Sequence, residues 1–269
     1  MCTLVLAWQV FEEAPVAVAA NRDEATDRPA NPPDVYDRDP LVVAPRDVEA
    51  GGTWIGCNDH GLFAGITNRW TDAPLAGERS RGLLVADVLD CASVDEAETV
   101  LESTTAVHEY EGFILVVADS DRAVCFGWDG ELTRTRFEPG VHVVVNVGFD
   151  DTFEIPTERR HAGEQQAANA GRVRSVLEEA TRTTTSGKID TREGSSAWLE
   201  RAGRVLGDHE YGVCVHGDGY GTRSSSLIAI GDGRGDWSAG EIATHISYSF
   251  ADGPPCRTPF EPVDLSGLE

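Results

Sequence analysis

Two short apolar segments open the chain, and an acidic turn separates them. Residues 4–8 and 16–20 are almost wholly apolar, with Glu12, Glu13 and Pro15 between them. Apolar runs of this length on either side of a turn predict an antiparallel hairpin. Successive side chains of a strand point to opposite faces, and in the first run both alternating sets are apolar. We therefore expect this strand to be buried on both faces.

The rest of the chain alternates between strand-like and helix-like patterns. A turn at 51–54 leads into a strand, and 62–68 is its partner, while Ser93 and Glu96 form a capping box that opens a helix to about residue 101. Further helices are predicted at 80–90, 157–181 and 197–206, and further strands at 113–118, 123–128, 131–137, 142–147, 212–216, 222–231 and 242–249. The Pro-rich stretch 25–50 predicts a long ordered loop or a pair of edge segments, 182–195 a loop, and 254–269 a tail.

This order of elements predicts an α+β fold. Helices have to cover the sheet faces that the strands leave apolar. The chain has no internal repeat, and no linker separates two cores. We therefore expect residues 1–269 to form a single domain.

The charge of the chain is strongly negative. Asp and Glu number 46 against 22 Lys and Arg, which gives a net charge of −24, and Lys188 is the only lysine. Such an acidic, lysine-poor surface resembles that of proteins from a high-salt cytoplasm. The same charge disfavours duplex nucleic acid and anionic membranes as partners.

Stability is therefore expected to depend on salt. Because counterions screen the repulsion between carboxylates, the melting temperature should rise as KCl increases from low to molar concentration. Thermal melts at several KCl concentrations measure this directly. A melting temperature that stays flat or falls would show that the acidic surface is not a salt adaptation.

The sequence carries no pattern of a secreted or metal-binding protein. It has no basic segment followed by an apolar one, and no apolar run approaches ~20 residues, so we expect a cytoplasmic protein with reduced thiols and no membrane insertion. Its six cysteines include no CxxC pair, and its seven histidines include no HExxH spacing. We therefore expect no metal site, and we expect Cys125 and Cys214 to be buried within strands.

Cys2 is the strongest candidate for chemistry. Because Cys2 is small and follows Met1 directly, we expect Met1 to be removed, which leaves a thiol and a free α-amine on one residue. An α-amine titrates near ~8 and is able to act as the base for its own side chain. We expect Cys2 to be the thiol most sensitive to electrophiles.

The second strand of the predicted hairpin ends in a polar cluster, Asn21, Arg22 and Asp23. In an antiparallel pair this end lies beside Cys2. An Asp near the α-amine would hold the amine in place, and an Arg would favour the thiolate. The alternative is that the cluster only caps the hairpin and anchors the Pro-rich stretch.

Several motifs together resemble one known family. They are the stretch from Met1 to Trp8, Asn21-Arg22-Asp23-Glu24, Gly51-Gly52-Thr53-Trp54, Gly65-Ile66-Thr67-Asn68-Arg69, Ser80-Arg81-Gly82 and Tyr220-Gly221-Thr222-Arg223. In this order they resemble the NRDE family, also called the transport and Golgi organisation protein 2 family, over nearly the whole chain. The resemblance implies a four-layer α-β-β-α sandwich similar to that of the N-terminal nucleophile hydrolases.

The resemblance also implies roles for residues outside the hairpin. It points to Asn68 and Asn146 as oxyanion donors, although each is equally suited to an Asx turn. Arg223 would bind an anionic substrate group or Asp23, or form a surface salt bridge. The hydrolases carry an Arg where this chain has Ala20, and Arg22 would replace it from the same side of the strand.

Two functions remain open at this point. The first is hydrolysis of an amide or ester bond of a small molecule by Cys2, which requires no cofactor. The second is a non-catalytic carrier of haem, lipid or acyl-CoA that uses the same pocket, with Cys2 as a possible axial ligand of haem. The sequence does not determine the oligomeric state.

Overall fold

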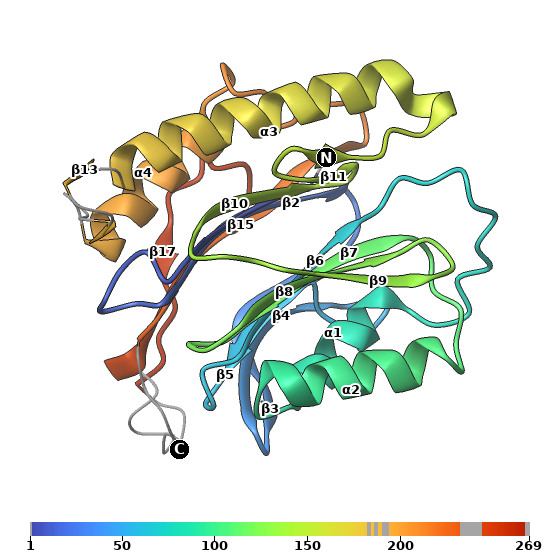
Figure 1. Cartoon of the computed structure of the whole chain (residues 1–269), viewed down its shortest axis with the longest axis horizontal. Coiled ribbons are helices and arrows are strands. Elements are labelled where there is room, and N and C mark those ends of the chain that lie inside the picture. The colour runs from blue at the N-terminus through green and yellow to red at the C-terminus, as the bar shows by residue number, and fades with distance from the viewer. Residues whose placement is uncertain (1, 182–183, 186–187, 190–193, 232–243, 267–269) are drawn as a thin grey trace.

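Two antiparallel sheets lie face to face, and helices cover the outer face of each (Figure 1). The structure is a computed structural model, and it describes residues 2–181, 184–185, 188–189, 194–231 and 244–266. The strands of the first sheet are β1 (Thr3–Trp8), β2 (Val16–Ala25), β10 (Gly140–Val145), β11 (Gly148–Phe149), β12 (Thr152–Phe153), β15 (Tyr220–Ile230), β16 (Ile246–Ala251) and β17 (Glu261–Pro262). Those of the second sheet are β3 (Ala30–Arg38), β4 (Leu41–Asp47), β5 (Ile55–Asn58), β6 (Phe63–Asn68), β7 (Phe113–Ala118), β8 (Ala123–Trp128) and β9 (Leu132–Arg136).

The helices form the two outer layers. They are α1 (Arg81–Leu89), α2 (Val94–Thr105), α3 (Arg160–Thr181), which follows the short helix η1 (Thr157–Arg159), and α4 (Ser195–Gly207). In Figure 1, α3 and α4 lie over the first sheet, and α1 and α2 lie against the second. No helix in the described part of the chain is both long and apolar enough to cross a bilayer. The predicted four-layer α-β-β-α sandwich is confirmed.

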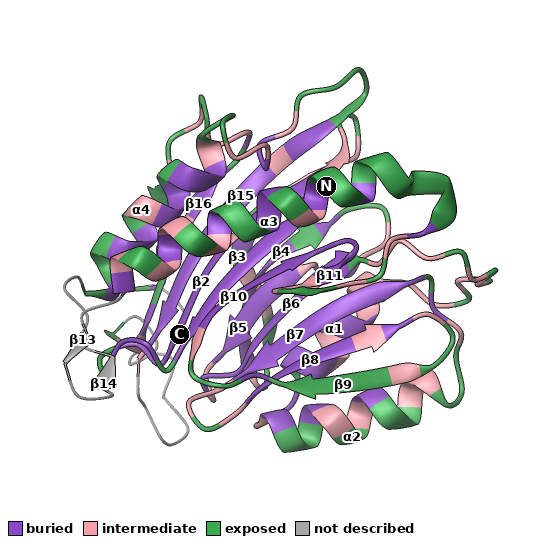
Figure 2. Cartoon of the chain, turned by 45° about the horizontal axis from the view of Figure 1, so that its top comes forward, coloured by how far each residue is buried: buried purple, intermediate pink, exposed green. Residues whose placement is uncertain are grey.

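β1 lies inside the first sheet and is buried on both faces, as predicted. It pairs with β10 on one side and with β2 on the other, where Thr3 lies opposite Asn21. Leu4, Leu6 and Trp8 pack into the core between the sheets, and the alternate side chains pack under α3 and α4. Figure 2 shows the neighbours of β1, strands β2 and β10, as largely buried, whereas the edge strand β9 is exposed. The predicted hairpin is therefore confirmed, and it holds Cys2 next to the end of β2.

The helix signals in the sequence act as expected. Ser80 caps α1 by accepting a hydrogen bond from the Gly82 N–H, and Ser93 caps α2 by accepting one from the Glu96 N–H. α2 continues to Thr105, past the predicted end near residue 101, because its last turn carries only polar side chains and so lacks an apolar marker.

The Pro-rich stretch 25–50 forms β3 and β4, so the loop interpretation is wrong, and the interpretation as a pair of edge segments is right only for β3, because β4 lies between β3 and β5. β3 lies at the edge of the second sheet, and its pairing with β4 shifts register between Asn31 and Asp34. The shift spans Pro32 and Pro33, which have no N–H to donate, and an edge strand tolerates such residues.

Three predictions in the last third are corrected. Residues 212–216 are not a strand, and within the described chain they contribute one isolated bridge, His216 to Gly221. Val215 N–H donates to the Thr222 hydroxyl and not to the backbone of a neighbouring strand. The predicted tail packs against the fold, because β17 pairs with β16 and Leu265 is buried. In the predicted loop 182–195, β13 (Thr184–Thr185) pairs with β14 (Lys188–Ile189). The remaining residues of 182–193, residues 242–243 of the predicted last strand, and 267–269 lie outside the described residues.

Candidate active site

A cavity of about 430 Å³ lies between the two sheets, where β1 begins and β2 ends. Cys2 and residues 20–24 line one side of it, and the opposite side comes from the loop before β5, the end of β6 and the start of α1. The cavity therefore joins the N-terminal hairpin to elements of the second sheet and its helix layer.

Cys2 is half-buried immediately before β1. Its Sγ lies 3.6 Å from the backbone oxygen of Asp23 and donates to it. Burial raises the pKa of the Cys2 thiol, and the negative charge of Asp23 raises it further. The thiol is therefore held in its neutral form, so a reaction at sulfur needs a base to take its proton.

Asp23 is almost completely buried on β2, with 2% of its surface exposed. Its Oδ1 accepts a 2.6 Å hydrogen bond from the Thr222 hydroxyl, and its backbone oxygen accepts a 3.0 Å bond from the Tyr220 hydroxyl. Burial raises the pKa of Asp23, while the hydrogen bond from Thr222 lowers it. This carboxyl group is thus fixed beside the start of the chain, as the sequence predicts.

Arg22 lies on the cavity side of β2, together with Ala20. Its guanidinium donates to Asp47 Oδ2 at 3.0 Å and lies over the ring of Trp54, 4.0 Å from the ring centroid. The predicted position of Arg22, two residues from Ala20 on the same side of the strand, is what the structure shows.

Asn21 also lines the cavity, but its side-chain amide forms its hydrogen bonds on the opposite face of β2. Its Nδ2 donates to the backbone oxygens of Leu206 at 3.1 Å and Val213 at 2.9 Å, and its Oδ1 accepts from the Ser225 hydroxyl. Asn21 therefore ties the hairpin to the segment that follows α4.

Of the two predicted oxyanion donors, one lines the cavity and the other contacts it from outside the cavity lining. Asn68 is at the end of β6 and lines the cavity, whereas Asn146 is not among the described residues that line it. Asn146 Nδ2 donates to the backbone oxygen of Asn68 at 2.6 Å, and its Oδ1 accepts from Gln166 at 2.8 Å. The structure therefore supports Asn68 as a cavity residue and gives Asn146 a positioning role in place of direct contact with substrate.

Arg223 is not brought into the cavity. The pairing of β15 with β2 shifts register between Thr222 and Ser224, so Arg223 is the extra residue of a β-bulge. Thr222, and not Arg223, binds Asp23 Oδ1, and Arg223 is absent from the described residues lining the cavity. The structure therefore supports neither of the two predicted pocket roles of Arg223, and the surface salt bridge stays a prediction.

The structure adds cavity residues that sequence reasoning missed, among them Arg28, Asp47, Arg79 and Arg81. Asp47 binds Arg22 at 3.0 Å and Arg28 at 2.7 Å, and Arg81 binds Glu111 at 2.9 Å. In a chain of net charge −24, this cavity thus has four arginines in its lining. The signal was present, because Ser80-Arg81-Gly82 is one of the motifs that identify the family.

Two glycines explain how these motifs meet. A Cβ on Gly52 would lie 2.2 Å from the Gly82 carbonyl carbon, so the backbones approach this closely only because Gly52 lacks a side chain, and a Cβ on Gly82 would also be tight, 3.1 Å from the Thr53 oxygen. Thr53 N–H donates to the Gly82 oxygen at 3.0 Å. This contact holds Trp54 and Arg81 on the same wall of the cavity.

Thiol accessibility partly corrects the expectation that Cys2 alone is placed to react. Burial raises the pKa of Cys57 and of Cys91 to about 12, and it raises that of Cys125 as well. Cys256, however, is exposed. The predicted removal of Met1 concerns a residue outside the described part of the chain and stays a prediction.

The histidines and cysteines also depart from expectation, because His209, Cys214, His216 and Cys256 lie together. The expectation of no metal site relied on ligand motifs within one short stretch of sequence, whereas these four side chains come from two segments that are far apart in the chain. The group lies outside the cavity lining.

Solved structures with the same fold are hydrolases. Penicillin V acylase from Agrobacterium tumefaciens is 17% identical, with a TM-score of 0.54 over 100% of this chain and 89% of that one. A mutant conjugated bile acid hydrolase from Clostridium perfringens is 11% identical, with a TM-score of 0.58 over 100% of this chain and 95% of that one. The chain has the fold of the N-terminal nucleophile hydrolases.

Sequence comparison gives the family. The family model described as Transport and Golgi organisation 2 matches residues 1–240. The Transport and Golgi organization protein 2 homolog of Bos taurus is 29% identical over 231 residues, 79% of this chain and 81% of that protein. The human homolog of the same name is 27% identical over 230 residues, again 79% of this chain and 81% of that protein. This protein therefore belongs to the Transport and Golgi organisation 2 family.

Proposed function

We propose that the protein is an N-terminal-cysteine hydrolase that cleaves an amide or ester bond of a small molecule. The observation that carries this proposal is the position of Cys2, whose half-buried thiol lines the cavity and lies against Asp23. The two solved proteins that share the fold are an acylase and a bile acid hydrolase by name, which supports the same reaction class. Because fold alone does not fix function, the arrangement around Cys2 carries the argument.

The mechanism starts from the neutral thiol. Once Met1 has been removed, the α-amine of Cys2 takes the thiol proton while sulfur attacks the substrate carbonyl, and a tetrahedral oxyanion forms. The resulting ammonium gives its proton to the leaving amine or alcohol as the carbon–heteroatom bond breaks, which leaves a thioester on Cys2. Water then attacks the thioester, its proton passes to the amine, and the acid product leaves with the thiol restored.

The surrounding residues support these steps. In this mechanism the Asp23 carboxylate, which accepts from Thr222 and lies beside Cys2, orients the α-amine that removal of Met1 sets free. Asn68 is the candidate donor to the oxyanion, and the bond from Asn146 to its carbonyl fixes its backbone. Arg22 and Arg81 line the same cavity, and they favour a substrate that carries an anionic group near the cleaved bond. A cavity of about 430 Å³ has the size of a small-molecule site.

Intact-mass and peptide-mass spectrometry test the proposal. Protein shown to begin at Cys2 is mixed with a panel of small esters and amides that do or do not carry a carboxylate. We expect a transient acyl adduct that maps to Cys2, is hydrolysed with time and forms faster with the anionic members. Adduct on the exposed Cys256 is counted separately, because it reports only thiol accessibility.

Two outcomes would contradict the proposal. One is a processed protein that forms no adduct and releases no product from any panel member. The other is an adduct that never turns over. A carrier with the same pocket would instead bind ligands reversibly, and haem bound through Cys2 would give a Soret shift.

A further inference from the structure

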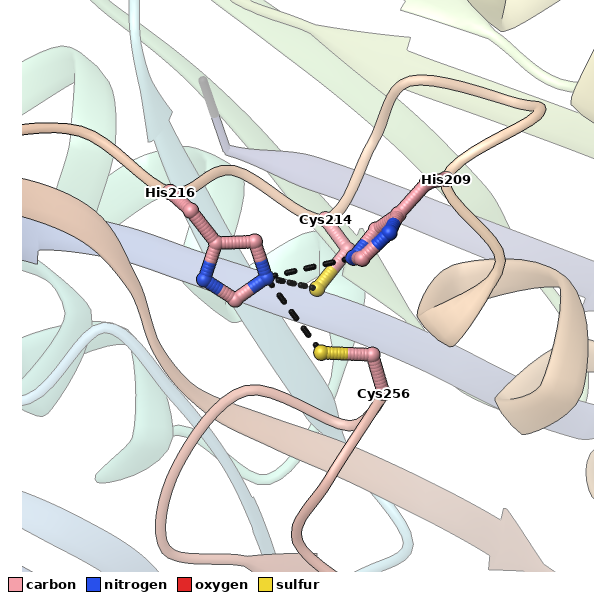
Figure 3. A group of neighbouring side chains, drawn as sticks. All are labelled: His209, Cys214, His216 and Cys256. Atoms are coloured by element: carbon pink, nitrogen blue, oxygen red, sulfur yellow. Dashed lines mark hydrogen bonds between the residues drawn. The ribbon is translucent and has the colours of Figure 1, made fainter.

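Four potential metal ligands converge outside the cavity, as Figure 3 shows. His209, Cys214 and His216 come from the segment between α4 and β15, and Cys256 comes from the loop after β16. One ligand atom of each lies within 4.8 Å of all the others. His216 Nε2 is at the centre of the group, 3.2 Å from His209 Nε2, 3.6 Å from Cys214 Sγ and 3.3 Å from Cys256 Sγ.

We propose that these four side chains form a zinc site. Two imidazoles and two thiols are one of the ligand sets that hold structural zinc with tetrahedral geometry. Bond lengths of about 2.0–2.1 Å to nitrogen and about 2.3 Å to sulfur place tetrahedral ligand atoms roughly 3.4 to 3.8 Å apart. The three separations around His216 Nε2 are within a few tenths of an ångström of that range. The side chains therefore need only small movements to coordinate an ion.

The backbone already holds Cys256 close to the other ligands. Gly253 has φ of 154°, and a Cβ there would lie 2.4 Å from the Thr258 hydroxyl oxygen, so this turn requires glycine. The N–H groups of Arg257 and Thr258 both donate to the Pro254 oxygen, at 3.1 and 3.0 Å. The loop that carries Cys256 is therefore a defined turn before any ion binds.

The end of α4 fixes the other side of this turn. A Cβ on Gly207 would lie 3.1 Å from the Cys256 nitrogen, so the last turn of α4 and the Cys256 loop are in close backbone contact. Asn21 of β2 holds the segment that carries His209. Its side-chain amide donates to the backbone oxygens of Leu206 and Val213, which lie before and after His209 in the chain. Both ligand-bearing segments are thus anchored to the first sheet.

The four ligands define a structural role for the metal. A catalytic zinc keeps a position open for water or substrate, whereas four protein ligands close the coordination sphere. The ion would join the segment after α4 to the loop after β16. The segment after α4 is also linked to Asp23 by two hydrogen bonds. Val215 N–H donates to the Thr222 hydroxyl at 2.9 Å, and this hydroxyl donates to Asp23. The metal proposal does not depend on the proposed hydrolase activity.

Arg257 is the one nearby group that has to move. Its guanidinium lies 3.3 Å from His216 Nδ1. When Nε2 of a neutral histidine binds a metal, the ring proton is on Nδ1, which then repels a second donor. Because Arg257 is exposed, it is able to turn toward water. Replacement of Arg257 by Ala should therefore retain metal binding or strengthen it.

Metal titration of the full-length protein tests the site. Metal-free protein, kept reduced with a phosphine, is titrated with Zn²⁺ in competition with a chromophoric chelator and, separately, with Co²⁺. We expect one metal ion per chain, with the ligand-field bands of tetrahedral cobalt and a thiolate-to-cobalt charge-transfer band. Zinc should also raise the melting temperature, because the ion binds the folded state.

Variants identify the ligands. Cys256→Ser and His209→Ala change exposed residues and should leave the fold intact, and each should weaken zinc binding more than roughly 100-fold, beyond the 10- to 100-fold typical of an outer partner. Cys256→Ser should also reduce the charge-transfer intensity. The matched controls are Arg257→Ala, on the same loop, which should bind zinc at least as tightly as the parent, and His108→Ala, an exposed histidine elsewhere, which should bind as tightly as the parent.

The proposal is overturned if the reduced parent protein takes up no stoichiometric zinc, or if its cobalt spectrum lacks a thiolate band. Equal zinc affinity of Cys256→Ser and the parent would overturn it as well, because the metal would then be bound elsewhere.

Discussion

Replacement of Cys2 by Ser is expected to lower kcat/KM by several orders of magnitude for any substrate that acylates the protein. Removal of an activated nucleophile has this effect because the remaining groups bind the substrate without forming the covalent intermediate. Serine has nearly the same size as cysteine, and Cys2 lies before β1, outside the strand pairing. The melting temperature should therefore stay close to that of the parent.

Cys91→Ala is the matched control for this experiment. Cys91 is a buried thiol after the end of α1, it does not line the cavity among the described residues, and its loss should leave kcat/KM within about twofold. The hydrolase mechanism is wrong if Cys2→Ser retains the activity of the parent. It is equally wrong if Cys91→Ala loses as much activity as Cys2→Ser.

Replacement of Asp47 by Ala is expected to lower the free energy of unfolding by about 3–5 kcal/mol, the range for removing one partner of a buried ion pair. Asp47 Oδ2 binds Arg22 at 3.0 Å and Arg28 at 2.7 Å, and Arg22 and Asp47 have side-chain exposures of 7% and 9%. Oδ1 accepts from the Glu49 and Ala50 N–H groups as well. The variant leaves the Arg22 guanidinium buried beside Trp54 with Glu24, at 3.8 Å, as its remaining ion-pair partner among the residues that the structure describes.

The same contact predicts a loss of stability in acid. Burial raises the pKa of Asp47, but the hydrogen bonds from Arg28 and Ala50 and the charges of both arginines bring it below its ordinary value. A carboxyl group with a lower pKa in the folded state stabilises the fold above its unfolded pKa, near ~3.9, and loses this contribution as pH falls through the folded pKa. Above about pH 5 the difference between parent and Asp47→Ala should be constant, and it should shrink in stronger acid.

Urea unfolding at several pH values measures both effects. Asp151→Ala is the matched control, because Asp151 also binds an arginine at 3.0 Å, Arg174, but has a side-chain exposure of 94%. An exposed pair contributes about 0–1 kcal/mol. Equal losses in the two variants, or a loss for Asp47→Ala that does not change in acid, would show that burial does not govern the Asp47 contacts.

Local patterns in the sequence were sufficient to place Cys2 beside Asp23. Two apolar runs around an acidic turn predict a hairpin, and antiparallel pairing then brings the ends of the two strands together, as the Thr3–Asn21 register shows. The period of two along β1 also predicted burial on both faces. These features depend on near neighbours in the chain, so they can be predicted from a single sequence.

Side-chain direction at the site depended on features that leave no such pattern. The β-bulge at Arg223 turns its neighbours toward Asp23 and the cavity, and no residue type marks a bulge reliably. The family resemblance implied that Asn146 donates to the oxyanion, but its side-chain amide instead accepts from Gln166 of α3 and donates to the backbone oxygen of Asn68. Both outcomes arise from contacts between elements that are distant in the sequence.

The sequence by itself determined the nucleophile candidate, the hairpin that holds it, the alternation of strands and helices, and, through its motifs, the family. Only the tertiary structure decided which charged residues from outside the hairpin line the cavity and which residues meet away from it. Asp47 and Arg81 reach the cavity from the second sheet and its helix layer, and Cys256 reaches His216 across 40 positions of the chain. The physical reason is that packing two sheets face to face brings together residues whose separation in sequence carries no information about their contact.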